Sequence, residues 1–287
     1  MSKAKPALLS WALLLCVFAG CAQTALSQAA AKPAPLGAPT PAAQHVRVTE
    51  TIVDASVPDD KRVDKMLELY SPKVRALDTV VGKLNGDLKK SQIGAGSLGN
   101  FVTDGIRAVA SQKLGKPILL VVTNNGGLRK NGITEGDLRL RDIFELLPFE
   151  NALVAFDLTG AQVLDLLRIV ISHRDAQSGA RIKYRITSDK RAELETARFL
   201  IDGREVEIDP AAIYTVISID YLLKVTGGDY TVLRQASNIR PLGITIRDAI
   251  TDYVKSETAA GRAIKSTLDG RFVFDKTASP GVEEPQP

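Results

Sequence analysis

The 287-residue chain has only two cysteines and two histidines. Both cysteines, Cys16 and Cys21, lie near the start, so the remaining chain can form no disulfide bond and offers no thiol nucleophile. His45 and His173 are far apart in the sequence, and no HExxH, paired CxxC or Asp-x-His motif occurs. A zinc or two-metal hydrolase site needs several imidazoles and carboxylates that converge. We therefore expect no metal site, no bound cofactor and no catalytic residue in this chain.

An excess of one charge is also absent. The formal net charge is +4 and the sequence pI is about 9.0, with acidic and basic residues interspersed. A nucleic-acid partner is therefore not expected. Aromatic residues make up only 5% of the chain, so those that fall in loops are informative. The hydrophobic content of 45% is enough for a full core in one large domain or two small ones.

The first 45 residues have the pattern of an export signal and a tether. Lys3 and Lys5 precede a short apolar run, which is typical of a secretory signal peptide over residues 1–21. The run ends in Phe-Ala-Gly-Cys and resembles a bacterial lipoprotein box, with Cys21 as the acylated residue. Ordinary cleavage nearby, which would release a soluble product, is the alternative. Residues 22–45 are rich in Ala and Pro, and they predict a semi-extended linker. The expected location is periplasmic or cell-surface, with a lipid anchor as the only membrane contact.

Residues 46–276 are predicted to form one mixed α/β domain with helices packed on sheets, followed by a disordered tail over 277–287. Apolar residues at period two, or in continuous β-branched runs, predict strands, and helical spacing predicts helices. The expected strands cover 46–53, 118–122, 152–158, 182–187, 199–201, 205–208, 214–219 and 272–274. The expected helices begin near Asp59, near Leu98 with Asn100 close to the N-cap, at Arg141, after the capping residue Thr159 and after Thr245. The first of these is expected to continue its apolar face past Pro72 to Val81.

A loop of unusual composition follows the predicted buried strand at 118–122. It contains Asn124, Gly126, Gly127 and Arg129. Asn and Gly tolerate positive φ, so this chain segment could turn sharply and approach a ligand closely. The Arg129 guanidinium suits phosphate or hydroxyl-rich ligands. A solvated surface turn is the alternative interpretation.

Two further loops combine aromatic and polar side chains. One contains Phe149 and Asn151, and the other contains Tyr221 and Asp229, with Gly227 and Gly228 before Asp229. Two aromatic rings from separate loops could hold a planar group between them. A carboxylate such as Asp229 can accept hydrogen bonds from two ribose hydroxyls. Packing of each ring in the core is the alternative.

Five motifs occur in order and carry a family resemblance. They are Leu98–Asp104 (LGNFVTD), Asn124–Arg129 (NNGGLR), Leu147–Asn151 (LPFEN), Leu158–Gly160 (LTG) and Gly227–Asp229 (GGD). Together they resemble the C-terminal domain of the 5'-nucleotidase / UDP-sugar hydrolase / 2',3'-cyclic phosphodiesterase family. The similarity runs from about residue 52 to about residue 274.

The resemblance implies a nucleoside-binding role. Phe149 and Tyr221 would stack on the base, Asp229 would hold the ribose, and Asn124, Arg129 and Asn151 would contact polar groups of the substrate. In that family a separate N-terminal metallophosphatase domain holds divalent metals and performs hydrolysis. No such domain is evident in this sequence. We therefore expect a nucleotide- or nucleoside-binding protein of nucleotide catabolism that assists a metallophosphatase chain in trans.

The sequence also departs from the family pattern. Asn125 replaces a loop glycine, Tyr221 replaces a Phe, and two extra residues separate Tyr221 from Gly227. Residues 91–95 replace a segment that carries Arg in the family. The altered segment at 91–95 and the two-residue insertion favour an alternative function, a surface scaffold or partner-binding lipoprotein that has lost its ligand.

Overall fold

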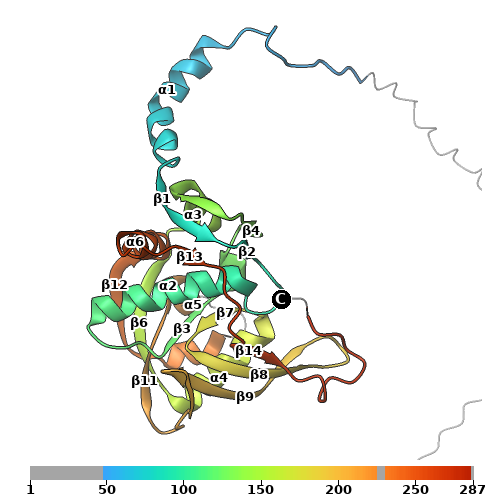
Figure 1. Ribbon diagram of the computed structural model, residues 1–287, viewed down its shortest axis with the longest axis vertical. Helices are drawn as coiled ribbons and strands as arrows, with labels where there is room; N and C mark the ends of the chain where they lie inside the picture. Colours follow the sequence, from blue (N-terminus) through green and yellow to red (C-terminus); the bar gives the residue numbers. More distant parts are fainter. Residues whose placement is uncertain (1–47, 225–229, 286–287) are drawn as a thin grey trace, which may run out of the picture. The chain divides into compact units, whose positions relative to one another are not determined.

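The computed structural model describes residues 48–224 and 230–285 (Figure 1). Cys21 and the predicted leader and linker lie outside these residues, as do Gly227, Gly228 and Asp229. The chain divides into two units, residues 1–58 and 59–287. In the first unit, residues 48–53 contain no strand. The strand predicted over 46–53 is therefore wrong for its described part.

The core of the second unit is a five-stranded sheet in the order β12-β6-β11-β3-β7. Strands β3 and β11 are parallel, and the other neighbours are antiparallel. All four residues of β3 are buried, as its continuous apolar sequence predicts for a strand that is covered on both faces. The strands are β3 (Leu120–Thr123), β6 (Ala152–Thr159), β7 (Ala176–Ser178), β11 (Ile213–Ile219) and β12 (Ser237–Thr245).

Three smaller sheets complete the strand pairing of the described residues. A four-stranded sheet contains β8 (Ala180–Ile186), β9 (Ala192–Ile201), β10 (Arg204–Glu207) and β14 (Phe272–Phe274). A three-stranded sheet contains β1 (Val80–Asn85), β5 (Gly136–Arg139) and β13 (Ile264–Lys265), and β2 (Leu88–Lys89) pairs with β4 (Gly132–Ile133). The predicted hairpin at Asp202-Gly203 is confirmed by the antiparallel pairing of β9 and β10.

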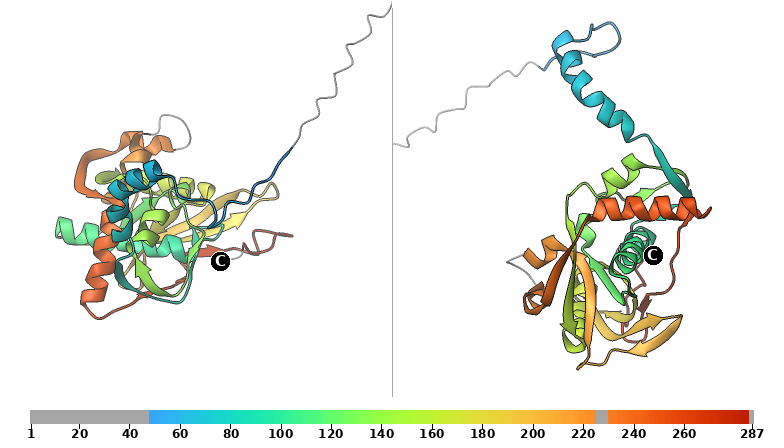
Figure 2. Two further views of the ribbon diagram at one scale, coloured as in Figure 1. Left: turned by 90° about the horizontal axis from the view of Figure 1, so that it is seen from above. Right: turned by 90° about the vertical axis from the view of Figure 1, so that its left-hand side faces the viewer.

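Helices cover the five-stranded sheet. α2 (Gly96–Leu114) packs against β3 and β7, and α4 (Gly160–His173) packs against β6 and β9. α6 (Ile246–Ala259) crosses α2, as Figure 2 shows, and it also contacts α3 (Leu140–Leu146). α5 (Asp220–Lys224) follows β11 directly. The mixed α/β fold class is therefore confirmed.

Helix α1 (Lys61–Ala76) begins after the N-cap Asp60 and contains Pro72. None of its residues is buried, and the side chains expected to form an apolar core face are exposed. The prediction that this face continues to Val81 is wrong, because Val80 and Val81 belong to β1. Among the residues that the structure describes, no helix combines the length and the apolarity needed to cross a membrane.

A predicted capping residue marks the start of α4 but not that of α2. Thr159 and Gln162 form the capping box that the sequence predicts at the start of α4. The N-cap predicted at Asn100 is wrong, because α2 already begins after Ala95, which has φ 57°. Asn100 lies inside α2 and its amide donates a hydrogen bond to the Thr267 carbonyl at 2.9 Å.

Part of the segment predicted as a disordered tail packs on the domain. Ser279, which lies in the predicted tail, is buried, and its hydroxyl accepts a hydrogen bond from the Ile186 N–H at 2.9 Å.

Candidate functional site

The first predicted loop leaves β3 and makes a turn of 3-10 helix, η1 (Asn125–Gly127). Asn124 has an extended conformation with φ −73°, and none of residues 124–127 has a positive φ. The expected left-handed turn is therefore wrong. Gly127 is needed for space instead, since a Cβ there would lie 2.9 Å from Asn124 Oδ1. The amide side chain of Asn124 thus lies across the turn.

A lysine from outside the predicted motifs supports this loop. Lys90 Nζ donates to the Asn125 carbonyl at 3.0 Å and to the Leu128 carbonyl at 2.7 Å. Its pKa is lowered by burial first and by repulsion from Arg129 second. Within the described part of the chain, neither Lys90 nor Arg129 has a carboxylate at salt-bridge distance. The loop therefore carries two nearby positive charges that are not neutralised.

A buried carboxylate holds the other side of the same loop. Asp175 Oδ1 accepts the Asn125 N–H at 2.6 Å, and Asp175 Oδ2 accepts the Tyr230 hydroxyl. Burial raises the pKa of Asp175, and the hydrogen bonds partly oppose that effect. The ring of His173 meets that of Tyr230 edge-on at 5.3 Å. Asp175 therefore joins the first predicted loop to Tyr230, the first residue of the 3-10 helix η2 (Tyr230–Gln235).

The second predicted loop is fixed by the first turn of α6. Arg247 donates to the carbonyls of Leu147 and Pro148 at 2.9 Å each, and Ile246 N–H donates to the Asn151 carbonyl at 2.9 Å. Phe149 between these anchors stays 48% exposed, so it is not a core residue. The Arg129 guanidinium lies 5.9 Å from the centre of the Phe149 ring. Two residues from separate motifs therefore meet in a cation–π contact.

The third predicted loop begins beside the second. Asp220, the first residue of α5, accepts the Ala152 N–H at 3.0 Å through its carboxylate. Tyr221 follows and is 51% exposed. No ring contact joins Tyr221 to Phe149 within residues 48–224. The predicted ribose-binding residue, Asp229, lies outside the described residues, so its place in the site stays a prediction.

These loops enclose a small hollow. Its lining includes Thr123, Gly127, Leu128, Phe149, Asn151 and Ile219, so it joins the end of β3, the first two loops and the end of β11. The cavity volume is about 10 Å³, which is room for about one water molecule. A whole ring cannot enter a space of that size. A planar ligand would therefore lie on the exposed Phe149 and direct only a small substituent inward.

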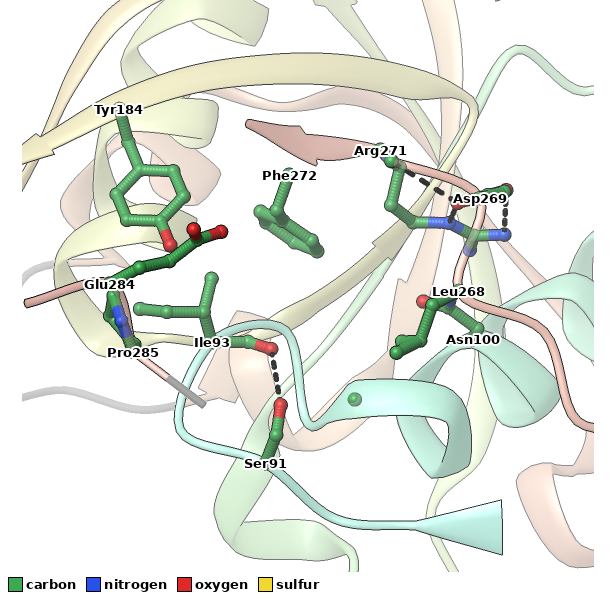
Figure 3. A pocket seen from close by; sticks show the side chains of 12 residues that line it. Ser91, Ile93, Asn100, Tyr184, Leu268, Asp269, Arg271, Phe272, Glu284 and Pro285 are labelled. Atoms are coloured by element: carbon green, nitrogen blue, oxygen red, sulfur yellow. Dashed lines mark hydrogen bonds and ion pairs between the residues drawn. The ribbon is translucent and has the colours of Figure 1, made fainter. Parts of the chain in front are cut away.

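A second polar cluster, around Arg271, lies apart from the predicted residues. Figure 3 shows Arg271 beside Asp269 in a separate pocket that none of the predicted site residues lines. The Arg271 guanidinium donates to both carboxylate oxygens of Asp104, at 3.0 and 2.8 Å, and of Asp269, at 2.9 and 2.7 Å. These bonds raise the pKa of Arg271 against the opposing effect of burial. Within the described residues, no group of three or more His, Cys, Asp or Glu side chains is arranged to hold a metal ion.

Sequence reasoning missed the supporting residues of the site. Lys90, Asp175 and Arg247 belong to none of the recognised motifs, yet each holds a loop backbone in place. No local signal marks them, since their partners are 38, 50 and 100 residues away in the sequence. Asn125, which departs from the family glycine, is accommodated because its side-chain amide donates to the Arg174 carbonyl at 3.3 Å.

Comparisons with known proteins agree with this mixed α/β fold. Residues 76–235 match the family "5'-nucleotidase, C-terminal domain", which is more than half of the chain. The chain therefore belongs to that family.

Curated relatives are similar along most of this chain. It is 28% identical over 233 residues to the Bacillus subtilis "Trifunctional nucleotide phosphoesterase protein YfkN", covering 78% of this chain and 15% of the relative. It is 27% identical over 250 residues to the Listeria monocytogenes "Cell wall protein Lmo0130", covering 83% of this chain and 30% of the relative. The chain thus spans less than a third of the length of these two relatives.

A solved structure shares the fold. The 5'-nucleotidase precursor from Thermus thermophilus superposes with a TM-score of 0.63 at 24% sequence identity. The match covers 75% of this chain and 43% of that protein. It supports the fold that is described above, at an identity too low to assign an activity.

Proposed function

We propose that this chain binds the nucleoside part of a nucleotide over Phe149, in nucleotide catabolism. The cation–π contact between Arg129 and the half-exposed Phe149 is the observation that carries this proposal. An aromatic ring that stays exposed beside an unneutralised guanidinium is suited to stack on a base while the charge meets a phosphate. Tyr221 and Asn151, on neighbouring loops, would contact the base, and Asp229 would hold the ribose.

The unneutralised charge supports a nucleotide as the ligand. Lys90 and Arg129 lie close enough for their charges to interact, and both are anchored to the carbonyls of one loop. A phosphate would relieve the repulsion between them. Asn124 lies between β3 and η1, where its amide can bond to the sugar or the base.

Hydrolysis is assigned in this proposal to a separate metallophosphatase. The relative named "Trifunctional nucleotide phosphoesterase protein YfkN" supports a link to phosphoester chemistry. Export is supported by the relative named a cell wall protein and by the Lys3-to-Cys21 leader pattern. Lipid attachment at Cys21 in the periplasm or at the cell surface is part of the same proposal.

Calorimetric titration of the purified chain with adenosine, AMP and UDP-glucose tests the binding. We expect Phe149→Ala to weaken binding by about 5- to 150-fold, because stacking on a base contributes about 1–3 kcal/mol. Phe272→Ala is the matched control, since Phe272 lines the separate pocket beside Arg271. Absence of binding heat with all three ligands would remove the proposal.

A second candidate function is binding to a protein partner. Helix α1 has no buried residue, and five apolar side chains at helical spacing are between 47% and 60% exposed: Val63, Met66, Leu67, Tyr70 and Val74. Such a face is costly to leave in water. Under this alternative the chain acts as a scaffold. A Leu67→Glu variant would then lose its partner in size-exclusion chromatography while keeping any affinity for nucleotides.

A further inference from the structure

Thr123 is the last residue of β3, and it lines the hollow beneath Phe149. The residue is 1% exposed. Its hydroxyl oxygen is buried and has no hydrogen-bond partner among the described residues. Because buried polar groups are nearly always paired, an unpaired one at a cavity wall points to a bound group.

Thr123 is an exception within this structure. Within residues 48–224 and 230–285, the other buried serine and threonine hydroxyls all have partners, namely those of Ser97, Thr103, Ser178, Ser218 and Ser279. Ser218 is instructive, because it lies on the adjacent strand β11 and donates to the Val122 carbonyl at 2.8 Å. Hydroxyls with a purely structural role in this sheet are therefore satisfied internally, and the Thr123 hydroxyl is not.

The Thr123 hydroxyl is the unpaired group that faces this hollow. Asn124 Oδ1 is also buried without a partner among the described residues, but Asn124 is not one of the residues that line the hollow. A hydroxyl can donate or accept hydrogen bonds, so a group that enters the hollow could satisfy Thr123 with an N–H donor or with a carbonyl oxygen.

The size of the hollow limits what can enter. With about 10 Å³ it holds one group about as large as a water molecule, and Leu128 and Ile219 give it apolar walls. An exocyclic amino group on a base that stacks on Phe149 has the right size, and it supplies an N–H donor to the Thr123 hydroxyl. We infer that Thr123 is a specificity-determining residue that accepts a hydrogen bond from the exocyclic amino group of the base. This inference rests on the proposed nucleoside-binding function.

Ligands that differ by this one group provide the test. The purified chain is titrated with adenosine, with purine riboside, which lacks the amino group, and with inosine, which has a carbonyl in its place. We expect adenosine to bind about 3- to 10-fold more tightly than the other two, as one buried hydrogen bond allows. In Thr123→Val the preference of adenosine over purine riboside should disappear.

Thr103→Val is the matched control, because Thr103 is an equally buried threonine whose hydroxyl is bonded to the Gly99 carbonyl at 2.8 Å. It should keep the adenosine preference of the original chain. Thr123→Val should fold with an unchanged or higher Tm, since a methyl group of the same shape replaces an unpaired hydroxyl.

The outcomes separate this inference from the function on which it rests. An adenosine preference that survives in Thr123→Val, or that is absent from the original chain, overturns the role of Thr123 while nucleoside binding stands. A lower Tm of Thr123→Val would show that the hydroxyl is already satisfied, and it would also overturn the inference. If none of the three ligands binds the original chain, the proposed function fails, and the inference fails with it.

Discussion

Two arginines of this molecule are used in opposite ways. The side chain of Arg271 is 8% exposed, and all five of its N–H donors are bonded, to Asp104, to Asp269 and to the Gln177 carbonyl. Arg129 is exposed, has one hydrogen bond to the Gly126 carbonyl at 3.3 Å, and lies over an exposed ring. A saturated guanidinium joins distant segments of a fold, whereas an unsaturated one is available to a ligand.

The same contrast separates the neighbourhoods of the two residues. The Arg271 cluster connects α2 with the segment before β14, and its polar groups bond to one another. The segment around Arg129 has two unpaired oxygens, on Thr123 and Asn124, and two cations, on Lys90 and Arg129, that no carboxylate among the described residues neutralises. We expect substitutions in the first region to change stability and substitutions in the second to change binding.

Arg271→Met should lower the free energy of unfolding by about 3 kcal/mol. Removing the shared cation leaves the carboxylates of Asp104 and Asp269 without a countercharge, and their partial exposure places the effect at the lower end of the range for such pairs. Urea denaturation measures it. Calorimetry on the folded protein should give an unchanged AMP affinity. A loss of affinity similar to that of Phe149→Ala would show that the Arg271 cluster also takes part in binding.

Arg247→Met should lower both the stability of the protein and its affinity for AMP. It removes two hydrogen bonds to the carbonyls before Phe149, so we expect a loss of about 1–2 kcal/mol in unfolding free energy. The loop would no longer be held, and AMP affinity should fall about tenfold because ordering it would then oppose binding. Compared with Arg247→Met, Arg247→Lys should recover part of the unfolding free energy and part of the AMP affinity. A variant with normal AMP affinity would show that the Phe149 loop needs no support from α6.

Thr103→Val should lower the free energy of unfolding by about 1 kcal/mol, whereas Thr123→Val should not lower it. Thr103 Oγ1 donates to the Gly99 carbonyl and accepts from Arg271 at 3.4 Å, so its loss leaves groups unpaired. Parallel urea titrations of the two variants measure the difference. Equal destabilisation would mean that the two hydroxyls have equivalent surroundings.

The pH dependence of AMP binding should report the charge of Lys90. Its pKa lies below the ordinary 10.5, so its charge is lost earlier as the pH rises. The affinity for AMP should therefore fall as the pH rises through that lowered pKa, while the affinity for adenosine should stay constant. At neutral pH, Lys90→Met should bind AMP about threefold more weakly, as expected for a partly exposed charge pair.

Two controls accompany the pH experiment. Lys90→Met should lose the alkaline decrease, because Arg129 stays charged throughout this range. Lys116→Met should keep it, since Lys116 bonds to Thr215 at the other end of β11. A decrease that is identical for AMP and adenosine would indicate a change in the protein instead of a lost charge.

Much of the fold could be predicted from local patterns. The continuous run at 118–122 predicts β3, the Thr159–Gln162 capping box predicts the start of α4, and the Asp202-Gly203 turn predicts the β9–β10 hairpin. The failures occurred where tertiary contacts outweighed local preference. Val80 and Val81 fit a helical pattern, but they belong to β1, which pairs with β5.

The site was predictable only in part. The motifs named the loops, and the structure brings Arg129 to Phe149 and places Phe149 and Asn151 on one hollow. It also shows that none of residues 124–127 has a positive φ, and that a need for space explains Gly127 in η1. The residues that hold the loops were not predictable, because each bonds across 38 to 100 residues of sequence.

By itself, the sequence determined many of the helices and strands, the three loops and the family to which the chain belongs, since these follow from local periodicity, capping and short motifs. Only the tertiary structure decided which polar groups are satisfied. Thr103 and Thr123 are the same residue type, and each is flanked by a valine in the sequence. Their hydroxyls differ because one meets Gly99 and Arg271 in space and the other meets the wall of a hollow.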